Sequence, residues 1–362
     1  MQKWLFGVSA AVATVAVLGA CGGGAKATPT ATAATKAVTT TSSASATATA
    51  AAPASPTDLV ATKKAPASLA VDDAAWKDAA VTPIRTILIG TSKATEAKTV
   101  NVQALYNDTD VWFRFEWPDA TQKDTDAFSW DGGKWIPPSG KPDRLSLNWE
   151  IAPIADFEAK GCQGICHRST TDPIDKWYMI APKAGELIDN WQWTPVDTGP
   201  VGQAKDYTIT GGELPDPKVL ESSIVGDKLD SGGYASNATT APAAPGPVKM
   251  QDPSKPPTYG AKYLAPADAI PLDMSKVKAG DTIPRRTISP FVGSRGDIQA
   301  KHAYAAGKWT VVFHRKLDTG HTDDVKFVTS KSYPFGLAVF NDLDHFNHTV
   351  SEGAFMLKFK TN

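Results

Sequence analysis

Residues 111–118 read Val-Trp-Phe-Arg-Phe-Glu-Trp-Pro, and this segment decides the fold class. One set of alternate positions holds only large apolar side chains, and the other set holds Trp112, Arg114 and Glu116. Alternation with a period of two is typical of a half-buried β-strand. The closing proline lacks a backbone N–H group, so the strand is expected to end there.

Three other segments repeat this alternation, at residues 145–149, 309–315 and 355–359. They predict an all-β fold, an antiparallel β-sandwich with one buried face per sheet. One helical turn is expected at residues 72–77, where two aspartates favour a helix N-terminus. Residues 211–285 are rich in proline, glycine, alanine and serine, and we expect a long irregular insertion there.

The N-terminus predicts a secreted lipoprotein. Lys3 gives a basic start, residues 4–20 are mostly apolar, and the run ends in Leu-Gly-Ala before Cys21. This pattern is typical of a signal peptide over residues 1–20, with lipid attached to Cys21 after cleavage. A spanning helix is the alternative, but the apolar run is short for a bilayer and glycines follow it. We therefore expect an extracytoplasmic protein held on the cell membrane, either periplasmic or at the cell surface.

Residues 21–66 follow as a predicted disordered tether, because alanine, threonine, serine and proline offer little to bury. A glycosylated stalk is an open alternative for the same composition. Residues 67–362 are long enough for one large β-domain or two small ones. The net charge of the whole chain is −1, which argues against a nucleic-acid partner.

The sequence Cys162-Gln-Gly-Ile-Cys166-His167 is the main candidate for a cofactor site. Two cysteines followed by histidine can offer two thioether bonds and one iron ligand to haem. The usual motif has two residues between the cysteines, whereas three lie between them here. The alternatives are a short disulfide between Cys162 and Cys166, since Cys21 would carry lipid, and a metal or free-thiol role.

Several segments together resemble the ethylbenzene dehydrogenase-type haem-binding domain, a family that includes the gamma subunits of type II dimethyl sulfoxide reductase-like enzymes and related electron-transfer cytochromes. The resemblance covers most of residues 67–362 except the long insertion. The matching segments are Asp72 to Trp76, Phe115 to Asp119, Asp143 to Leu145, Gly161 to His167, Trp309 to Val325 and Tyr333 to Phe340.

The resemblance implies a β-sandwich with one haem between its sheets, b-type or c-type. It implies an electron-transfer protein with a redox partner protein, and no enzyme activity of its own. His167 becomes the first candidate iron ligand, with a surface histidine as the alternative. No hydrolytic motif, phosphate loop or dinucleotide fingerprint competes in the sequence.

The second iron ligand has two candidates. His348 follows the predicted strand at residues 336–340, where many relatives carry a histidine; the alternative is an exposed loop histidine. The family's gamma subunits use a methionine and a lysine, which makes Met179 the thioether candidate, with simple packing as its alternative. Related cytochromes often carry a histidine where this chain has Gln192. Three alternatives follow: another residue takes the ligand role, the iron is five-coordinate, or no haem is bound.

Arg315 is a candidate partner for the haem propionates, because guanidinium groups hold carboxylates bidentately. A structural ion pair with Asp318 or Asp324 is the alternative. The same loop contains Asp323, so a calcium loop is conceivable, but these acids lack the regular spacing of such loops.

Gly336 and Ala338 share one face of a predicted strand, which leaves room either for a flat ligand or for tight packing. His314 is expected to be a packed or sheet-surface histidine. A carbohydrate-binding surface lipoprotein is the alternative function, because eleven tryptophans and the start at Asp72 to Trp76 also fit modules that stack aromatic rings on sugars. A scaffold with an aromatic core is the third. Neither sugar binding nor a scaffold role requires a histidine directly after two cysteines.

Overall fold

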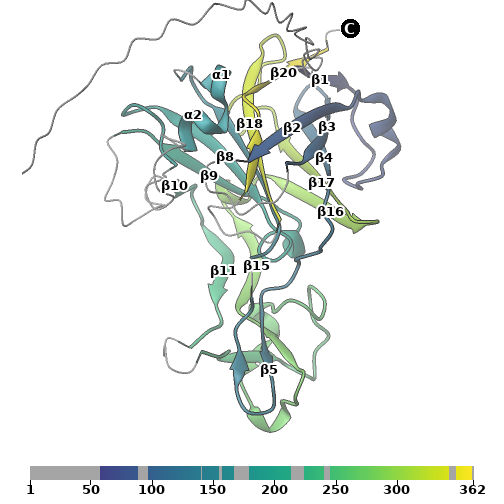
Figure 1. Ribbon diagram of the computed structural model, residues 1–362, viewed down its shortest axis with the longest axis vertical. Coiled ribbons are helices and arrows are strands. Elements are labelled where there is room, and N and C mark those ends of the chain that lie inside the picture. Colours follow the sequence, from purple (N-terminus) through teal and green to yellow (C-terminus); the bar gives the residue numbers. More distant parts are fainter. Residues whose placement is uncertain are drawn as a thin grey trace, which may run out of the picture. The chain divides into compact units, whose positions relative to one another are not determined.

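Two layers of β-strands face each other across an aromatic core (Figure 1). Within the described residues, thirteen strands belong to one hydrogen-bonded system. Their bounds are β1 (Asp58–Lys63), β2 (Thr82–Leu88), β3 (Thr99–Tyr106), β4 (Asp110–Pro118), β7 (Arg144–Glu150), β8 (Leu187–Trp193), β9 (Lys205–Thr210), β10 (Ile224–Gly226), β16 (Gln299–Ala305), β17 (Lys308–Lys316), β18 (Tyr333–Phe340), β19 (Thr349–Ser351) and β20 (Phe355–Phe359).

The first layer has the order β10-β9-β8-β7-β18-β19, and the second has the order β2-β3-β4-β17-β16. Neighbouring strands in both orders are antiparallel, whereas β1 pairs in parallel with β20 and β3. The predicted antiparallel β-sandwich is therefore confirmed.

The computed structural model describes residues 58–88, 97–139, 141–154, 157–166, 179–212, 224–239, 245–341 and 348–360. All of them belong to one compact unit, Pro53–Asn362. The predicted signal peptide, Cys21 and most of the predicted tether lie outside the described residues, as do His167 and the side chain of Cys166. In the ranges that the structure describes, no helix is long and apolar enough to span a bilayer.

Two strands join the layers at one edge. In β1, residues 58–61 pair with β20 in the first layer, and residues 62–63 pair with β3 in the second. In β2, residues 82–85 pair with β3, and residues 86–88 pair with β19. The predicted tether boundary at residue 66 is therefore wrong, because β1 already belongs to the sandwich.

The smaller elements lie mainly in the predicted insertion. β5 (Ala127–Trp130), β6 (Trp135–Ile136) and β14 (Thr282–Pro284) form a three-stranded sheet, β11 (Ser231–Ser236) pairs with β15 (Arg286–Val292), and β12 (Lys249–Gln251) pairs with β13 (Ala269–Pro271). The helices are α1 (Phe157–Lys160) and α2 (Cys162–Cys166), with 3₁₀ turns at Ala74–Asp78, Gly199–Val201, Pro266–Asp268, Met274–Lys276 and Ser294–Gly296. Residues 211–285 are thus less irregular than predicted, since β10 to β14 all lie there.

Aromatic rings from both layers fill the core. Phe113 of β4 lies 5.5 Å from Trp149 of β7, measured between ring centroids, and Trp117 lies 6.4 Å from Trp193 of β8. Trp309 of β17 is also buried and packs on Trp193 at 5.3 Å. The predicted alternation of β4 is confirmed, and the strand ends at its proline. In the described ranges every tryptophan is buried or half-buried, so these rings serve mainly as core.

The predicted helical turn near Trp76 is confirmed as a 3₁₀ turn. The carboxylate of Asp73 accepts a hydrogen bond from the backbone N–H of Ala75 at 3.0 Å, which satisfies a free donor at the start of the turn. Trp76 itself is buried, and its face is therefore not available to stack on a sugar.

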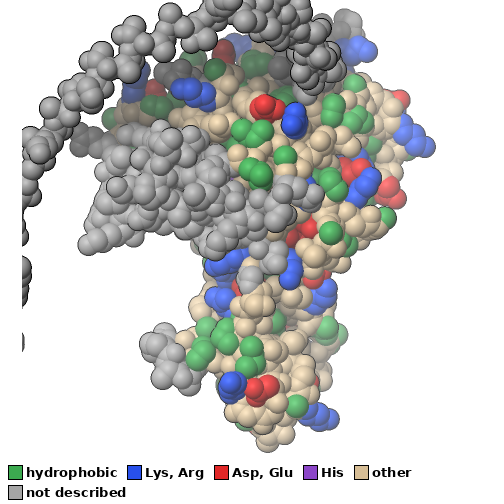
Figure 2. Space-filling model, viewed as in Figure 1, with side chains coloured by type: hydrophobic (Ala, Val, Ile, Leu, Met, Phe, Trp, Pro, Cys, Tyr) green, Lys and Arg blue, Asp and Glu red, His purple; other side chains and the backbone are tan. Residues whose placement is uncertain are grey.

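Charged side chains of both signs are interspersed on the face shown in Figure 2. This mixed surface agrees with the near-neutral net charge of the chain.

His302 of β16 makes the stability of the sandwich sensitive to acid. Its ring lies 5.1 Å from Trp193 and 5.9 Å from Trp309. Burial lowers its pKa to about 4, with Lys301 acting in the same direction and Asp124 opposing it. The unfolded chain, whose histidine pKa is about 6.5, therefore takes up this proton first as pH falls.

We expect the free energy of unfolding to drop by about 2 kcal/mol through this histidine between pH 6.5 and 4, and His302→Gln to remove that share. Urea unfolding at both pH values, on wild type and variant, measures the difference. An identical pH dependence in the two proteins would contradict the prediction.

Candidate functional site

The outer face of β7, β8 and β18, on the side opposite the aromatic core, carries a second apolar cluster. Helices α1 and α2 lie over this face (Figure 1). Its buried members are Ile154, Phe157, Cys162, Ile165, Ala181, Ile188, Ile209, Ala338 and Val350, with Ile87, Met179, Ile224 and Phe340 packed at its margin. We call this the helix-covered face.

Gly336 lets α2 approach the sheet closely. A Cβ atom at this position would lie 2.7 Å from the Cys162 sulfur and 2.8 Å from the Cys162 backbone nitrogen. Both distances are shorter than a van der Waals contact. Of the two interpretations of Gly336, tight packing is therefore favoured, because the helix occupies the space that a flat ligand would use.

We expect Gly336→Ala to lower the free energy of unfolding by about 2 to 3 kcal/mol, because the added methyl group must displace helix backbone. Urea denaturation monitored by circular dichroism measures this. Gly133→Ala is the matched control, since the nearest atom to its Cβ would be an aspartate oxygen at 3.7 Å. Equal free energies of unfolding for the two variants would show that α2 moves away from the sheet without loss of stability.

A chain of side-chain hydrogen bonds runs across the helix-covered face to Cys162. The amide of Gln192 donates to Asn190 at 2.7 Å, and Asn190 donates to the Asn148 oxygen at 2.6 Å. Asn148 in turn donates to the Cys162 sulfur at 3.2 Å. Gln192 thus belongs to a structural amide network.

His348 lies beside Phe340, at the margin of the same face. It is buried and stacks on Phe340, with ring centroids 4.4 Å apart and an interplanar angle of 24°. The guanidinium carbon of Arg144 lies 5.9 Å from the centroid of the same Phe340 ring. The exposed-loop alternative for His348 is therefore wrong.

Met179 packs half-buried against the helix-covered face, to which Cys162 and Phe340 also belong. The next residue, Ile180, donates its backbone N–H to Ile165 of α2 at 3.0 Å, which places Met179 beside the helices. The structure thus brings Met179, Cys162 and, through Phe340, His348 to one apolar face. His167 lies outside the described residues.

These residues fit a haem by the chemistry of their donors. An imidazole and a thioether are both axial ligands of haem iron, and apolar walls exclude water from it. The predicted place for a haem, between the sheets, is filled in the described residues by the aromatic core. The helix-covered face is the part of the described structure that brings an imidazole and a thioether together.

Arg315 lies elsewhere, at one end of the aromatic core between the two layers. Its side chain is 1 % exposed, and Nη1 donates to Asp189 of β8 at 2.8 Å. Nη2 donates to the backbone carbonyl of Val325, and the guanidinium lies 4.8 Å from the ring centroid of Trp191. These contacts favour the structural ion pair over a propionate contact, with Asp189 as the partner.

Several aspartates surround Arg315 and form what we call the buried acidic cluster. Its members are Asp189 of β8, Asp206 of β9, Asp227 after β10, Asp297 before β16, and Asp323 and Asp324 in the loop after β17. Carboxylate oxygens of Asp189, Asp206 and Asp324 lie within 4.8 Å of one another. Oxygens of Asp227, Asp323 and Asp324 do the same.

Burial dominates the acid–base behaviour of this cluster. Loss of water raises the pKa of Asp206 well above its usual range, and the neighbouring Asp189 carboxylate raises it further. Burial also raises the pKa of Asp189, against the opposing effect of Arg315. It raises the pKa of Asp227 to about 8 and that of Asp297 to about 7.

Asp318 is separate from this cluster. It pairs with Lys326 on the surface and accepts a hydrogen bond from the Gly320 backbone. His314 is half-buried, stacks on Trp112 at 4.9 Å and lies 3.0 Å from Asp110. The expectation of a packed histidine at His314 is confirmed.

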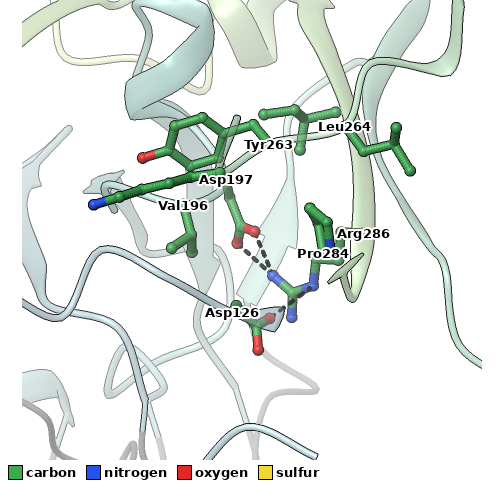
Figure 3. A pocket seen from close by; sticks show the side chains of 9 residues that line it. Asp126, Val196, Asp197, Tyr263, Leu264, Pro284 and Arg286 are labelled. Atoms are coloured by element: carbon green, nitrogen blue, oxygen red, sulfur yellow. Dashed lines mark hydrogen bonds and ion pairs between the residues drawn. The ribbon is translucent and has the colours of Figure 1, made fainter. Parts of the chain in front are cut away.

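A recess near β14 and β15 is too small for an organic ligand. It encloses about 10 Å³, which is room for about one water molecule. Figure 3 shows Arg286 between Asp197 and Asp126, and its Nη1 donates to Asp197 at 2.5 and 2.6 Å. The recess is therefore a polar junction, and no ligand site is inferred there.

This chain was compared with protein families, with curated protein sequences and with solved structures. A family model described as ethylbenzene dehydrogenase matches residues 72–351. No match was found among curated protein sequences.

Among solved structures, a carbohydrate binding module of family 9 from Caldicellulosiruptor kristjanssonii matches in complexes with cellotriose and with glucose. Both have 8% sequence identity and a TM-score of 0.32, cover 84% of this chain and cover 94% and 96% of their own. A Bacteroides uniformis protein with a proposed carbohydrate-binding role matches at 7% identity and a TM-score of 0.37, covering 84% of this chain and 100% of its own.

Proposed function

We propose that this chain, which belongs to the ethylbenzene dehydrogenase family, is a haem-binding electron-transfer protein held at the outer side of a membrane. The family is associated with the haem-binding gamma subunit of dimethyl sulfoxide reductase-type enzymes, which is consistent with a non-catalytic subunit of an oxidoreductase. The observation that carries the proposal is the family match over residues 72–351, the range that contains Met179 and His348.

The helix-covered face supplies the binding groups in this proposal. His348 and Met179 are the described candidates for iron ligands, and His167 is the candidate outside the described residues. Phe340 holds the imidazole of His348 in place by stacking, and the buried apolar members of the face exclude water. Arg144, whose guanidinium carbon lies 5.9 Å from the Phe340 ring centroid, is a cation near this face that would pair with haem carboxylates.

Bound haem would supply a one-electron couple at its iron. With two protein ligands the iron has no open position, so the chain would pass electrons between a donor and an acceptor protein. This role requires a redox partner, which the family association also implies.

The test is the absorption spectrum of the full-length protein expressed with ample haem and an active export pathway. We expect a Soret band that shifts on dithionite reduction and returns on oxidation. Acid–acetone extraction then separates c-type from b-type haem, because only a thioether-bonded haem stays with the polypeptide. A colourless protein would overturn the proposal.

Sugar binding has weaker support from the described residues. Sugar recognition by stacking requires an exposed aromatic face, whereas the described tryptophans are buried or half-buried. Tyr234 is 43 % exposed, but the Arg286 guanidinium carbon lies 4.8 Å from its ring centroid. Oligosaccharide binding in calorimetry, together with a colourless protein, would establish that alternative.

The lipid anchor has a separate test. Cys21→Ala removes the sulfur that the lipid requires, so we expect the protein to leave the membrane fraction or to remain unprocessed. Detergent partitioning and mass spectrometry of the mature N-terminus measure both results. Cys162→Ala is the control, and it should keep its lipid. Unchanged membrane retention of the Cys21 variant without lipid would contradict the prediction.

A further inference from the structure

The buried acidic cluster contains more negative charge than its protein contacts balance. Asp189, Asp206 and Asp324 are 0, 0 and 3 % exposed, and Arg315 lies 2.8 Å from an Asp189 oxygen and 3.8 Å from an Asp206 oxygen. Three carboxylates exceed one guanidinium by two negative charges. Burying unpaired charge at this depth costs several kcal/mol unless a cation or a proton neutralises it.

Several of these oxygens also lack hydrogen-bond donors within the described part of the chain. Both oxygens of Asp206 have no hydrogen-bond partner, although one of them lies 3.8 Å from Arg315. Asp189 uses Oδ2 for Arg315 and for the backbone N–H of Val325, which leaves Oδ1 without a partner. Asp324 accepts from Thr319 through Oδ2 and likewise leaves Oδ1 without one. Buried polar atoms are rarely left this way.

The spacing of the oxygens fits one metal ion. Calcium binds oxygen ligands at about 2.3 to 2.6 Å, so two ligands on opposite sides are about 5 Å apart. The ligand atoms of Asp189, Asp206 and Asp324 all lie within 4.8 Å of one another. They therefore fit within the coordination sphere of a single ion.

We propose that Asp189, Asp206 and Asp324 bind a divalent cation, and that calcium is the ion that fits best. The ligands are all carboxylates, which select hard cations over zinc or copper. Calcium is preferred to magnesium because magnesium gives up its water reluctantly, whereas this site is buried. Asp227 and Asp323 also have carboxylate oxygens within 4.8 Å of Asp324, so they extend the site.

The ion would tie together parts of the chain that are distant in sequence. Asp189 and Asp206 come from neighbouring strands β8 and β9, and Asp324 comes from the loop between β17 and β18. Val325 in that loop already bonds to Asp189 and Arg315 through its backbone. A bound cation therefore holds the loop against the end of the core, independently of any haem.

The test uses full-length protein stripped with a chelator and dialysed. Isothermal titration is made with calcium chloride and with magnesium chloride, and the calcium content of untreated protein is measured by mass spectrometry. We expect about one tightly bound calcium, much weaker magnesium binding, and a rise in Tm of about 5 to 10 °C at saturating calcium. A folded protein without calcium, and with no heat or Tm response, would overturn the proposal.

Two variants locate the site. Asp206→Asn keeps the shape but removes the charge, and we expect calcium affinity to fall by about 100-fold or more. Asp318→Asn is the matched control, because this acid of the same loop pairs with Lys326 at the surface; its calcium affinity should match wild type. Unchanged affinity in Asp206→Asn would also overturn the proposal. Should that variant fail to fold, Asp324→Asn and the wild-type calcium content decide in the same way.

Discussion

Arg315→Met is expected to lower the free energy of unfolding by about 4 kcal/mol, because it leaves buried carboxylates without their cation. Asp189 loses a 2.8 Å ion pair, the Val325 carbonyl loses its donor, and Trp191 loses the cation over its ring. Methionine fills much of the volume, so the effect comes mainly from charge. Urea unfolding with a fixed calcium concentration measures it.

Two controls separate charge from geometry. Arg315→Lys keeps the charge but loses the planar set of donors, so it should fall between wild type and Arg315→Met. Lys326→Met removes a cation whose side chain is 63 % exposed, and its effect should be under about 1 kcal/mol. A loss below 1 kcal/mol for Arg315→Met would show that the acids are neutral through bound protons.

His348→Ala is expected to abolish or shift the Soret band of the haem-loaded protein, while the far-ultraviolet circular dichroism stays close to wild type. The sheet is preserved because its core draws on residues of the other face, such as Phe113, Leu147 and Leu337. The stacking partner Phe340 also remains in β18. Absorption spectra of the ferric and ferrous forms measure the effect.

Matched variants show whether the effect is specific. His314→Ala removes a histidine stacked on Trp112 in the other layer and should leave the spectrum unchanged. Met179→Ala should shift the spectrum if its thioether is the second ligand, and Met274→Ala, at an exposed position, should not. An unchanged Soret band in both His348→Ala and Met179→Ala would remove these residues from the list of ligands. His167→Ala would then be the next variant to measure.

The sandwich was predictable from sequence where one face of a strand is buried. In β4 the pattern from Val111 to Trp117 gave both the strand and its buried side, because period-two alternation follows directly from strand geometry. Strand β1 was missed, since Asp58–Lys63 follows a stretch of small residues and carries only Leu59 and Val60 as large apolar side chains. β1 is a strand because it pairs with β20 and β3, and the local sequence does not predict those pairings.

The candidate site was only partly predictable for a similar reason. Cys162 and His348 drew attention because of their chemistry, but their common face depends on α2 and on the end of β18. Of the acidic cluster, the sequence drew attention only to Asp323 and Asp324, as part of a calcium loop with Asp318. Asp189, Asp206, Asp227 and Asp297 were missed because they come from separate strands and loops. One signal was present: Asp189 occupies the same face of β8 as Trp191 and Trp193, so an acid stands where the alternation requires an apolar residue.

The pairing of β1 with β20 has a consequence for how the chain reaches its folded state. Lys358 of β20 contacts Asp58 of β1 across 300 residues of sequence. A ribosome therefore makes β1 long before its partner exists, and the seam between the layers closes only after β20 has emerged. Contacts this remote make folding slow, because a very long loop must close before they form. A chain cut before residue 355 would leave β1 with an open edge, where strands of other molecules can add.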